Sequence, residues 1–296
     1  IDACRSATIA DYCHRALELG LEEICFTTHI EFGQIGGGND KVVFYQGKPW
    51  SIFDLEWLDG YLAEIRQAQK EFAKLKVKAG AEIGYHRKYE DVIAQIVGQY
   101  PFDYVLGAIH CLEGYSIASK DESPLYFAGR NLAAVRREYF NLLEEAVKSG
   151  LFDAVAHLDI YCRYGVRHFG EQISTIHRGA VEPVLKEMAR RGMALEINTS
   201  SLSRGLKEFH PSREIVALAV KSGLRIFTVG SDAHKPDELG RRLDEALALL
   251  KEFNVVPHVF SQHKASPLQP LPLSKNSAQP YEPAHRLQMS GNSKNN

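Results

Sequence analysis

Along residues 1–253, short apolar runs alternate with longer segments whose apolar residues recur at helical spacing. The runs EEICFTT (22–28) and DYVLGAI (103–109) have the length and composition of buried strands. The segment NLAAVRREYFNLLEEAVKSG (131–150) is typical of the helices, and it ends at a glycine, as helices often do. We expect six strands, each followed by a helix, and this alternation predicts parallel pairing with right-handed crossovers.

The first element that the pattern predicts is a helix rather than a strand. Its amphipathic segment runs from Thr8 to Leu19, and we expect a preceding strand that this chain begins too late to contain. Six visible strands are therefore one or two fewer than a (β/α) barrel needs. The predicted helices cover 8–19, 55–75, 89–100, 131–150, 174–192, 211–223 and 236–253.

Three segments depart from the alternation. Residues 33–54 are Gly-rich and aromatic, and residues 115–129 form a second long insertion. Both follow a predicted strand, where barrel loops shape substrate access, so we expect them to do so here. Residues 254–296 hold half of the chain's 12 prolines among polar residues and show no apolar periodicity. The chain therefore divides into a barrel domain, 1–253, and a tail, 254–296, that we expect to be mostly disordered.

Acidic or histidine side chains stand just past the apolar runs. Barrel enzymes assemble their active sites at the carboxyl ends of the strands, and imidazoles and carboxylates bind divalent transition metals. Such a metal cluster would make hydroxide available near neutral pH and could clamp the oxygens of a phosphate ester. The side chains are His29, Glu82, His110, His157, Glu196, Asp232 and His234.

Each of these residues alone has a simpler explanation. A lone histidine is more often a hydrogen-bonding group, Asp232 could cap the following helix, and Glu196 could be half of an ion pair. Their repeated placement at strand ends in apolar surroundings favours a metal centre, because burying them all without metals or partners would be costly.

Composition narrows the class of protein. The net charge of −2 and the lack of a long basic run argue against nucleic acid as a partner. No apolar stretch approaches membrane-spanning length, so no membrane partner is expected either. The five cysteines are odd in number and scattered, which makes a disulfide framework improbable and predicts a reducing, cytoplasmic location.

Five segments, taken in order, resemble the PHP (polymerase and histidinol phosphatase) family, and its histidinol-phosphatase branch more closely. The resemblance covers about residues 1–253 and implies a distorted (β/α)7 barrel with up to three divalent ions (zinc, manganese or iron). It also implies hydrolysis of a small phosphorylated substrate. The segments are GAEIGYH (80–86), YPFDYVLGAIHCLEG (100–114), VAHLDIYCRYG (155–165), LEINTSSL (195–202) and VGSDAHKPDELGR (229–241).

The resemblance also implies roles for individual residues. Glu82 would bridge two metals, with His110 and His157 completing the second ion, and Asp232 would bind the first ion. Residues His29 and His234 would bind the third ion. Catalysis would involve Glu82, Asp232 and Arg163, with Arg163 and Asn198 binding the substrate; the alternative for Arg163 is a solvated loop arginine.

This chain departs from the family pattern at its start. The family begins with a strand ending in H-x-H, and no H-x-H occurs here. We interpret the chain as N-terminally incomplete: as given it could hold the first metal only weakly and could be inactive, whereas the parent protein would be a competent enzyme.

Three functions are therefore compared. The favoured one is metal-dependent hydrolysis of L-histidinol phosphate to L-histidinol and phosphate, a step of histidine biosynthesis. The alternatives are a phosphoesterase acting on another phosphoester or on nucleic acid, and a non-catalytic barrel remnant that has lost its first metal-binding motif.

Overall fold

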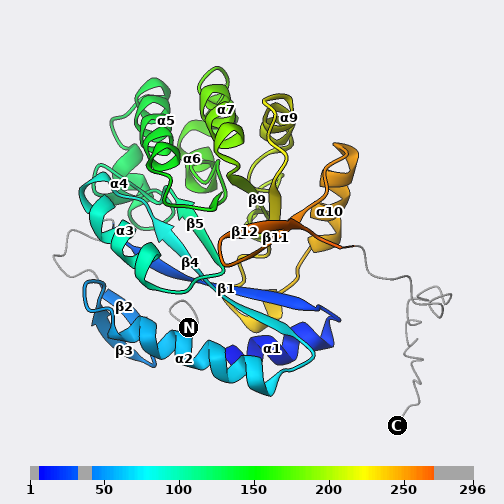
Figure 1. Cartoon of the computed structure of the whole chain (residues 1–296). Coiled ribbons are helices and arrows are strands. Elements are labelled where there is room, and N and C mark those ends of the chain that lie inside the picture. Colours follow the sequence, from blue (N-terminus) through cyan, green and yellow to red (C-terminus); the bar gives the residue numbers. More distant parts are fainter. Residues whose placement is uncertain (1–6, 33–41, 270–296) are drawn as a thin grey trace, which may run out of the picture.

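A computed structural model describes residues 7–32 and 42–269. Its centre is a curled sheet of parallel strands, with helices arranged in an arc around its outer face (Figure 1). This confirms the parallel sheet of six strands and the barrel-type fold. The strands, in their order across the sheet, are β1 (Glu23–Glu31), β4 (Lys76–Gly84), β5 (Tyr104–Ala108), β8 (Ala154–Val155), β9 (Ala194–Asn198) and β10 (Phe227–Gly230).

The helices connect successive strands and bury one apolar face each. In α1, for example, Ile9, Tyr12 and Cys13 are buried, and Thr8 caps the first turn by accepting a hydrogen bond from the Asp11 N–H. The long helices are α1 (Ile9–Glu18), α2 (Glu56–Glu71), α3 (Glu90–Gln99), α5 (Leu132–Ser149), α7 (Val181–Arg191), α9 (Arg213–Lys221) and α10 (Leu243–Glu252). The short ones are α4 (Ser123–Phe127), α6 (Cys162–Phe169), α8 (Ser200–Ser203), η1 (Arg87–Tyr89), η2 (Gly170–Thr175) and η3 (Pro236–Glu238).

Strand register brings the polar strand ends to one rim. In the β1–β4 pair, His29 lies opposite Glu82 and Glu31 lies opposite Gly84. In the β4–β5 pair, Gly84 lies opposite Ala108, two residues before His110. Because parallel strands point their carboxyl ends the same way, side chains far apart in the sequence meet at one edge of the sheet.

The sheet is open between its two outer strands. Within the described part of the chain, β1 and β10 each pair on one side only. The cavity between them, about 260 Å³, is lined by Phe26 and Thr28 from β1 and by Thr228 and Gly230 from β10. The residues described therefore form a curled half-barrel, and the polar rim remains continuous with this opening.

Two predicted helices are shorter in the structure. The segment 236–253 is divided into η3 and α10, because Gly240 and Arg242 adopt left-handed φ angles of 75° and 59°. The segment 174–192 becomes α-helical only at Val181, after the end of η2 and a turn in which Gly179 has a φ of 74°. The first insertion contains a β2 (Val42–Tyr45)–β3 (Lys48–Ser51) hairpin, and its residues 33–41 lie outside the described part.

The first part of the tail is folded, which corrects the prediction of disorder for residues 254–269. Strands β11 (His258–Ser261) and β12 (Lys264–Pro267) form a hairpin whose turn residues, Gln262 and His263, have φ angles of 49° and 62°. The Phe260 ring stacks on Tyr104 with 4.8 Å between ring centroids. Apolar periodicity could not reveal so short a hairpin; residues 270–296 lie outside the described part.

Replacing Phe260 by alanine should destabilise the protein by about 3 kcal/mol, because a buried aromatic ring would leave a cavity against β5. Urea denaturation measures the change. A matched control is Leu268→Ala, since Leu268 lies just past the hairpin but is 41% exposed. Equal stability of Phe260→Ala and the unaltered protein would show that the hairpin does not support the sheet.

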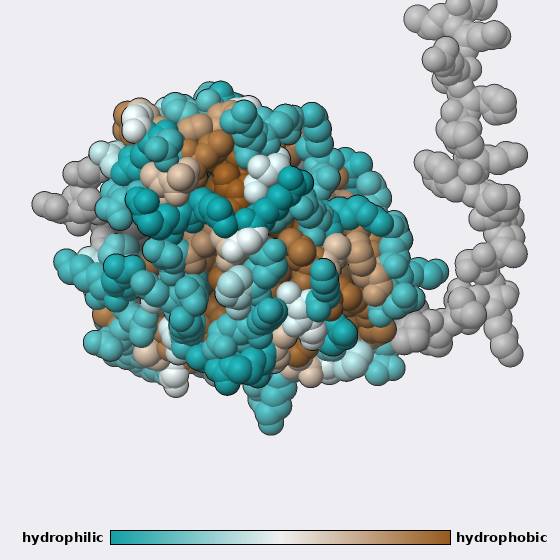
Figure 2. Space-filling view, turned by 90° about the horizontal axis from the view of Figure 1, so that it is seen from above, coloured by the Kyte–Doolittle hydropathy of each residue, from teal (hydrophilic) through white to brown (hydrophobic). Residues whose placement is uncertain are grey.

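The visible surface of the molecule is mostly hydrophilic (Figure 2). Seen from above, hydrophilic residues cover most of the molecule and hydrophobic residues show mainly in recesses between them (Figure 2). Exposed large hydrophobic side chains, such as Phe53, Leu125 and Val256, come from widely separated parts of the chain. Across residues 7–32 and 42–269, no helix combines the length and apolarity needed to cross a membrane.

Candidate metal centre

All the predicted metal ligands line one cavity of about 260 Å³ at the carboxyl rim of the sheet. His29 lies near the end of β1 and Glu82 near the end of β4, whereas the others follow β5, β8 and β10 directly. The structure therefore brings together residues that are up to 205 positions apart in the sequence. They are His29, Glu82, His110, His157, Asp232 and His234.

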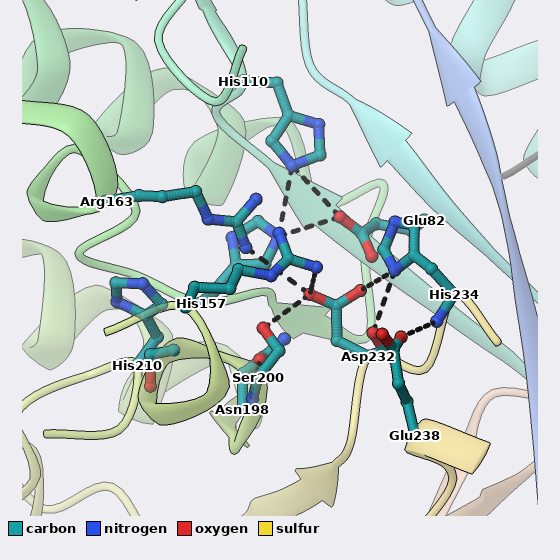
Figure 3. Close-up of polar contacts among 12 residues, drawn as sticks. Glu82, His110, His157, Arg163, Asn198, Ser200, His210, Asp232, His234 and Glu238 are labelled. Carbon is teal, nitrogen blue, oxygen red and sulfur yellow. Dashed lines mark hydrogen bonds and ion pairs between the residues drawn. The ribbon is translucent and has the colours of Figure 1, made fainter. Parts of the chain in front are cut away.

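A buried group of three ligands surrounds one oxygen of Glu82. Glu82 Oε1 lies 2.9 Å from His157 Nε2 and 3.1 Å from His110 Nε2. The two imidazole Nε2 atoms are 3.1 Å apart (Figure 3). Three donor atoms that converge in this way fit a single ion of the zinc type.

The second group consists of His29, Asp232 and His234, whose ligand atoms lie within 4.8 Å of one another. Glu82 connects the two groups, because its other oxygen, Oε2, lies 3.7 Å from His29 Nε2. A carboxylate with one oxygen toward each group is suited to bridging two ions. Glu82 therefore lies between two candidate ion sites. The resemblance divides the second group between two ions, one at Asp232 and one at His29 and His234, whereas the structure gathers these three ligands in one place.

Backbone strain accompanies two of the ligands. His157 has a φ of 24° and Asp232 a φ of 48°, values that non-glycine residues adopt uncommonly. His157 Nδ1 is also buried without a hydrogen-bond partner in the described residues. Such strain tends to persist where the surrounding structure fixes a functional side chain, and here it aims both ligands into the cavity.

The protonation states of Glu82 and His157 suit metal binding, whereas His110 must lose a proton when a metal binds, because the carboxylates of Glu31 and Glu82 outweigh its burial and raise its pKa to about 9. Burial alone would raise the pKa of Glu82, but His157, His29 and His110 outweigh this and hold the pKa well below its usual range. Burial also lowers the pKa of His157, despite the opposing charge of Glu82. An ionised carboxylate and a neutral imidazole are the forms that bind metal ions.

Two arginines approach the same carboxylate. Arg163, the second residue of α6, places Nη2 3.6 Å from Asp232 Oδ2, and Arg204 Nη2 lies 3.7 Å from the same oxygen. Burial, with Arg204 nearby, lowers the pKa of Arg163 to about 10, so that its guanidinium remains charged at neutral pH. Arg163 Nε and Nη2 have no acceptor among the described residues. A buried, incompletely paired guanidinium facing this cavity is suited to bind an anion.

Arg204 was not identified from the sequence. It lies six residues past β9, and no motif marked it as different from other surface arginines. The solvated-loop alternative for Arg163 is not what the structure shows, because its side chain is only 10% exposed.

Asn198 and Glu196 form a hydrogen-bonded pair next to the backbone of His157. Asn198 is buried, its amide donates to Glu196 Oε2 at 3.2 Å, and its Oδ1 accepts from the Ser200 N–H at 3.0 Å. Glu196 Oε2 also accepts from the His157 N–H at 3.0 Å. Both side chains therefore brace the His157 backbone, and Asn198 does not line the cavity of the ligands.

A buried histidine–carboxylate pair, His210 and Asp159, lies outside the ligand groups. His210 Nδ1 lies 2.5 Å from Asp159 Oδ1, and both side chains are buried. Asp159 Oδ2 accepts from the Ser212 N–H at 2.9 Å. No sequence motif marked His210, because its contact with Asp159 joins two loops that are 51 residues apart.

Glu196 should make the stability of the metal-free protein depend on pH. Burial and the carboxylates of Glu82 and Asp232 raise the pKa of Glu196 to about 8, from 4.5 for an ordinary glutamate. Between these values the unfolded chain releases a proton that the folded chain retains, so stability falls as pH rises. Glu196→Gln should reduce this fall, by up to about 1.4 kcal/mol per pH unit. Thermal denaturation with a chelator at about pH 5 and about pH 8 measures it; equal pH slopes would contradict it.

Residues 5–200 match the PHP domain family. The probable histidinol-phosphatase of Deinococcus radiodurans is 31% identical over 264 residues, covering 88% of this chain and 94% of that protein. The histidinol-phosphatase of Lactococcus lactis subsp. lactis is 27% identical over 239 residues, covering 80% and 82%.

Two solved structures share the fold. The Lactococcus lactis histidinol phosphate phosphatase, complexed with zinc, L-histidinol and phosphate, has a TM-score of 0.69 at 22% identity, covering 88% of this chain and 93% of that one. The putative histidinol phosphatase of Listeria monocytogenes has a TM-score of 0.64 at 20% identity, covering 82% and 96%.

Proposed function

We propose that this chain, which belongs to the PHP domain family, hydrolyses L-histidinol phosphate to L-histidinol and phosphate in a metal-dependent reaction. The observation that carries the proposal is the convergence of two ligand groups and two arginines on one cavity. Its similarity to known proteins supports this choice of substrate. The Deinococcus radiodurans relative is a probable histidinol-phosphatase, and the Lactococcus lactis relative is a histidinol-phosphatase.

The donor set supports zinc, manganese or iron, as imidazoles and carboxylates suit all three. Glu82 would hold two ions, with His110 and His157 completing the buried one. Asp232 would bind the other ion that Glu82 holds, and His29 and His234 would hold a third ion. When bound, such ions activate water near neutral pH and neutralise charge on phosphate oxygens.

The two arginines would bind the phosphate of the substrate. Arg163 and Arg204 both lie beside Asp232 and line the cavity of the ligands. A phosphate placed there would accept hydrogen bonds from both guanidinium groups, including Arg163 Nε and Nη2, which lack acceptors within the described residues. Charge that develops on the phosphate during hydrolysis would be stabilised by the same side chains.

The rim loops would limit access to the cavity. Ser116, Ala118 and Ser119, from the insertion 115–129, line the cavity beside His110. This placement supports the expectation that the insertion shapes the substrate pocket. Cys13, Cys25 and Cys162 are free thiols, which fits the cytoplasmic location that we propose.

The test is phosphate release from L-histidinol phosphate by the purified chain with added manganese or zinc. We expect a higher kcat/KM for this substrate than for unrelated phosphomonoesters, with more than one ion per chain by mass spectrometry. Equal or faster hydrolysis of unrelated phosphomonoesters would reject the substrate. One ion or none, without activity, would favour the barrel remnant, and cleavage of short oligonucleotides would favour a nuclease.

A further inference from the structure

Glu31 belongs to neither ligand group, yet it contacts a ligand directly. It is the last residue of β1, two positions past His29, so both side chains lie on the same face of the sheet. Its Oε1 lies 2.5 Å from His110 Nδ1. The Glu31 side chain is 21% exposed and lines the cavity of the ligands.

The two nitrogens of the His110 ring face different partners. Nε2 faces the buried group, 3.1 Å from both His157 Nε2 and Glu82 Oε1, whereas Nδ1 faces Glu31. Figure 3 shows the Nε2 contacts as dashed lines on one side of the ring, with the other nitrogen turned away from them. An ionised carboxylate only accepts hydrogen bonds, so a hydrogen bond to Glu31 requires the proton on Nδ1. In a neutral ring, this leaves a lone pair on Nε2, directed at the buried group.

Gly84 provides the space that this arrangement needs. It lies opposite Glu31 in the β1–β4 pair, and a Cβ at Gly84 would come within 2.1 Å of Glu31 Oε2. The backbone of Gly84 does not require glycine, because its φ lies outside the left-handed region. Any larger residue at position 84 would therefore displace the Glu31 carboxylate and disturb its contact with His110.

The other imidazole of the buried group lacks such support. His157 Nδ1 has no hydrogen-bond partner among residues 7–32 and 42–269. Of the two histidines in the buried group, His110 therefore has a carboxylate, Glu31, at its outer nitrogen, and His157 has no such partner among the described residues. Carboxylates that accept from the outer nitrogen of a ligating histidine commonly set its tautomer and raise its affinity for the metal.

We propose that Glu31, in the space left by Gly84, is a positioning residue that fixes His110 with Nδ1 protonated and Nε2 free to bind a metal ion. The inference rests on the metal centre of the proposed function. It assigns Glu31 no direct bond to the metal and no contact with the substrate.

Glu31→Gln tests the assignment, since a glutamine amide can donate to Nδ1 and so allows the proton to move to Nε2. We expect zinc affinity at the buried group to fall about 10–100-fold and kcat to fall with little change in KM. Nitrogen NMR of the metal-free protein, recorded above the His110 pKa of about 9 so that the ring is neutral, should show the Nδ1–H form of His110 in the unaltered chain and a loss of that form in the variant. Glu23→Gln, at the other end of β1, is the matched control and should change none of these.

Gly84→Ala provides an independent variant that leaves Glu31 in the sequence. It should lower zinc affinity and the Nδ1–H population in the same direction, whereas Gly98→Ala should not, because a Cβ at Gly98 meets nothing within 4 Å. Unchanged tautomer and affinity in Glu31→Gln would overturn the proposal. A chain that binds zinc without hydrolysing histidinol phosphate would reject the proposed substrate only, since the NMR and affinity measurements still decide the role of Glu31.

Discussion

Replacing Glu82 by glutamine is expected to lower kcat by at least about 10³-fold, above the roughly 10–100-fold cost of an outer-shell change. The physical reason is that the two oxygens of Glu82 face different ligand groups, 2.9 Å from His157 Nε2 and 3.7 Å from His29 Nε2. A glutamine offers one neutral oxygen and one N–H₂ group, which repels a cation. Two ions should therefore be weakened together, which no other single substitution in the site would do.

Metal analysis and activity assays on the same preparation measure this effect. The Glu82→Gln protein should contain fewer ions per chain than the unaltered protein. Glu138→Gln is the matched control, because Glu138 is a partly buried glutamate that accepts from the Tyr126 hydroxyl, away from both groups. If Glu82→Gln kept its full metal content and its activity, the bridging role would be rejected.

The sequence was sufficient to locate the ligands because strand direction determines where they go. Each apolar run ends just before or at a polar ligand, and parallel pairing then carries all the run ends to one rim. The register of β1 with β4 places His29 opposite Glu82 without any further assumption. Residues such as these can be predicted because backbone periodicity alone sets their position.

Other parts of the site depend on tertiary contacts that periodicity does not encode. Arg204 and His210 reach the site from the segment after β9, through turns whose path the sequence does not specify. Glu31 follows a predicted ligand by two residues, but the role proposed for it depends on the pairing of β1 with β4, which places Gly84 opposite it. The same limit explains why the β11–β12 hairpin was not predicted. Its sequence is polar and contains proline, and it is held to the sheet by one buried ring, Phe260, which stacks on Tyr104.

Arg163→Ala is expected to raise KM for the phosphate ester and to lower kcat/KM by about 10²–10³-fold while leaving metal content unchanged. Among the described residues, Arg163 contacts the predicted metal ligands through Asp232, at 3.6 Å, and it has no ligand atom of its own to offer a cation. Asp232 would keep Arg204 at 3.7 Å and the Ser200 hydroxyl at 2.9 Å, so its position should survive the substitution.

Two further variants distinguish a phosphate-binding role for Arg163 from a structural one. Arg163→Lys keeps the charge but loses the planar fork, so it should recover only part of kcat/KM. Arg167→Ala, four residues later in α6, removes a guanidinium that stacks on Tyr164 rather than facing the cavity, and should leave both constants unchanged. Phosphate inhibition gives a separate measure, since the inhibition constant should rise in Arg163→Ala along with KM. Loss of metal from Arg163→Ala would show instead that the arginine holds the ligand cluster together, because an anion-binding side chain can be removed without disturbing the cations.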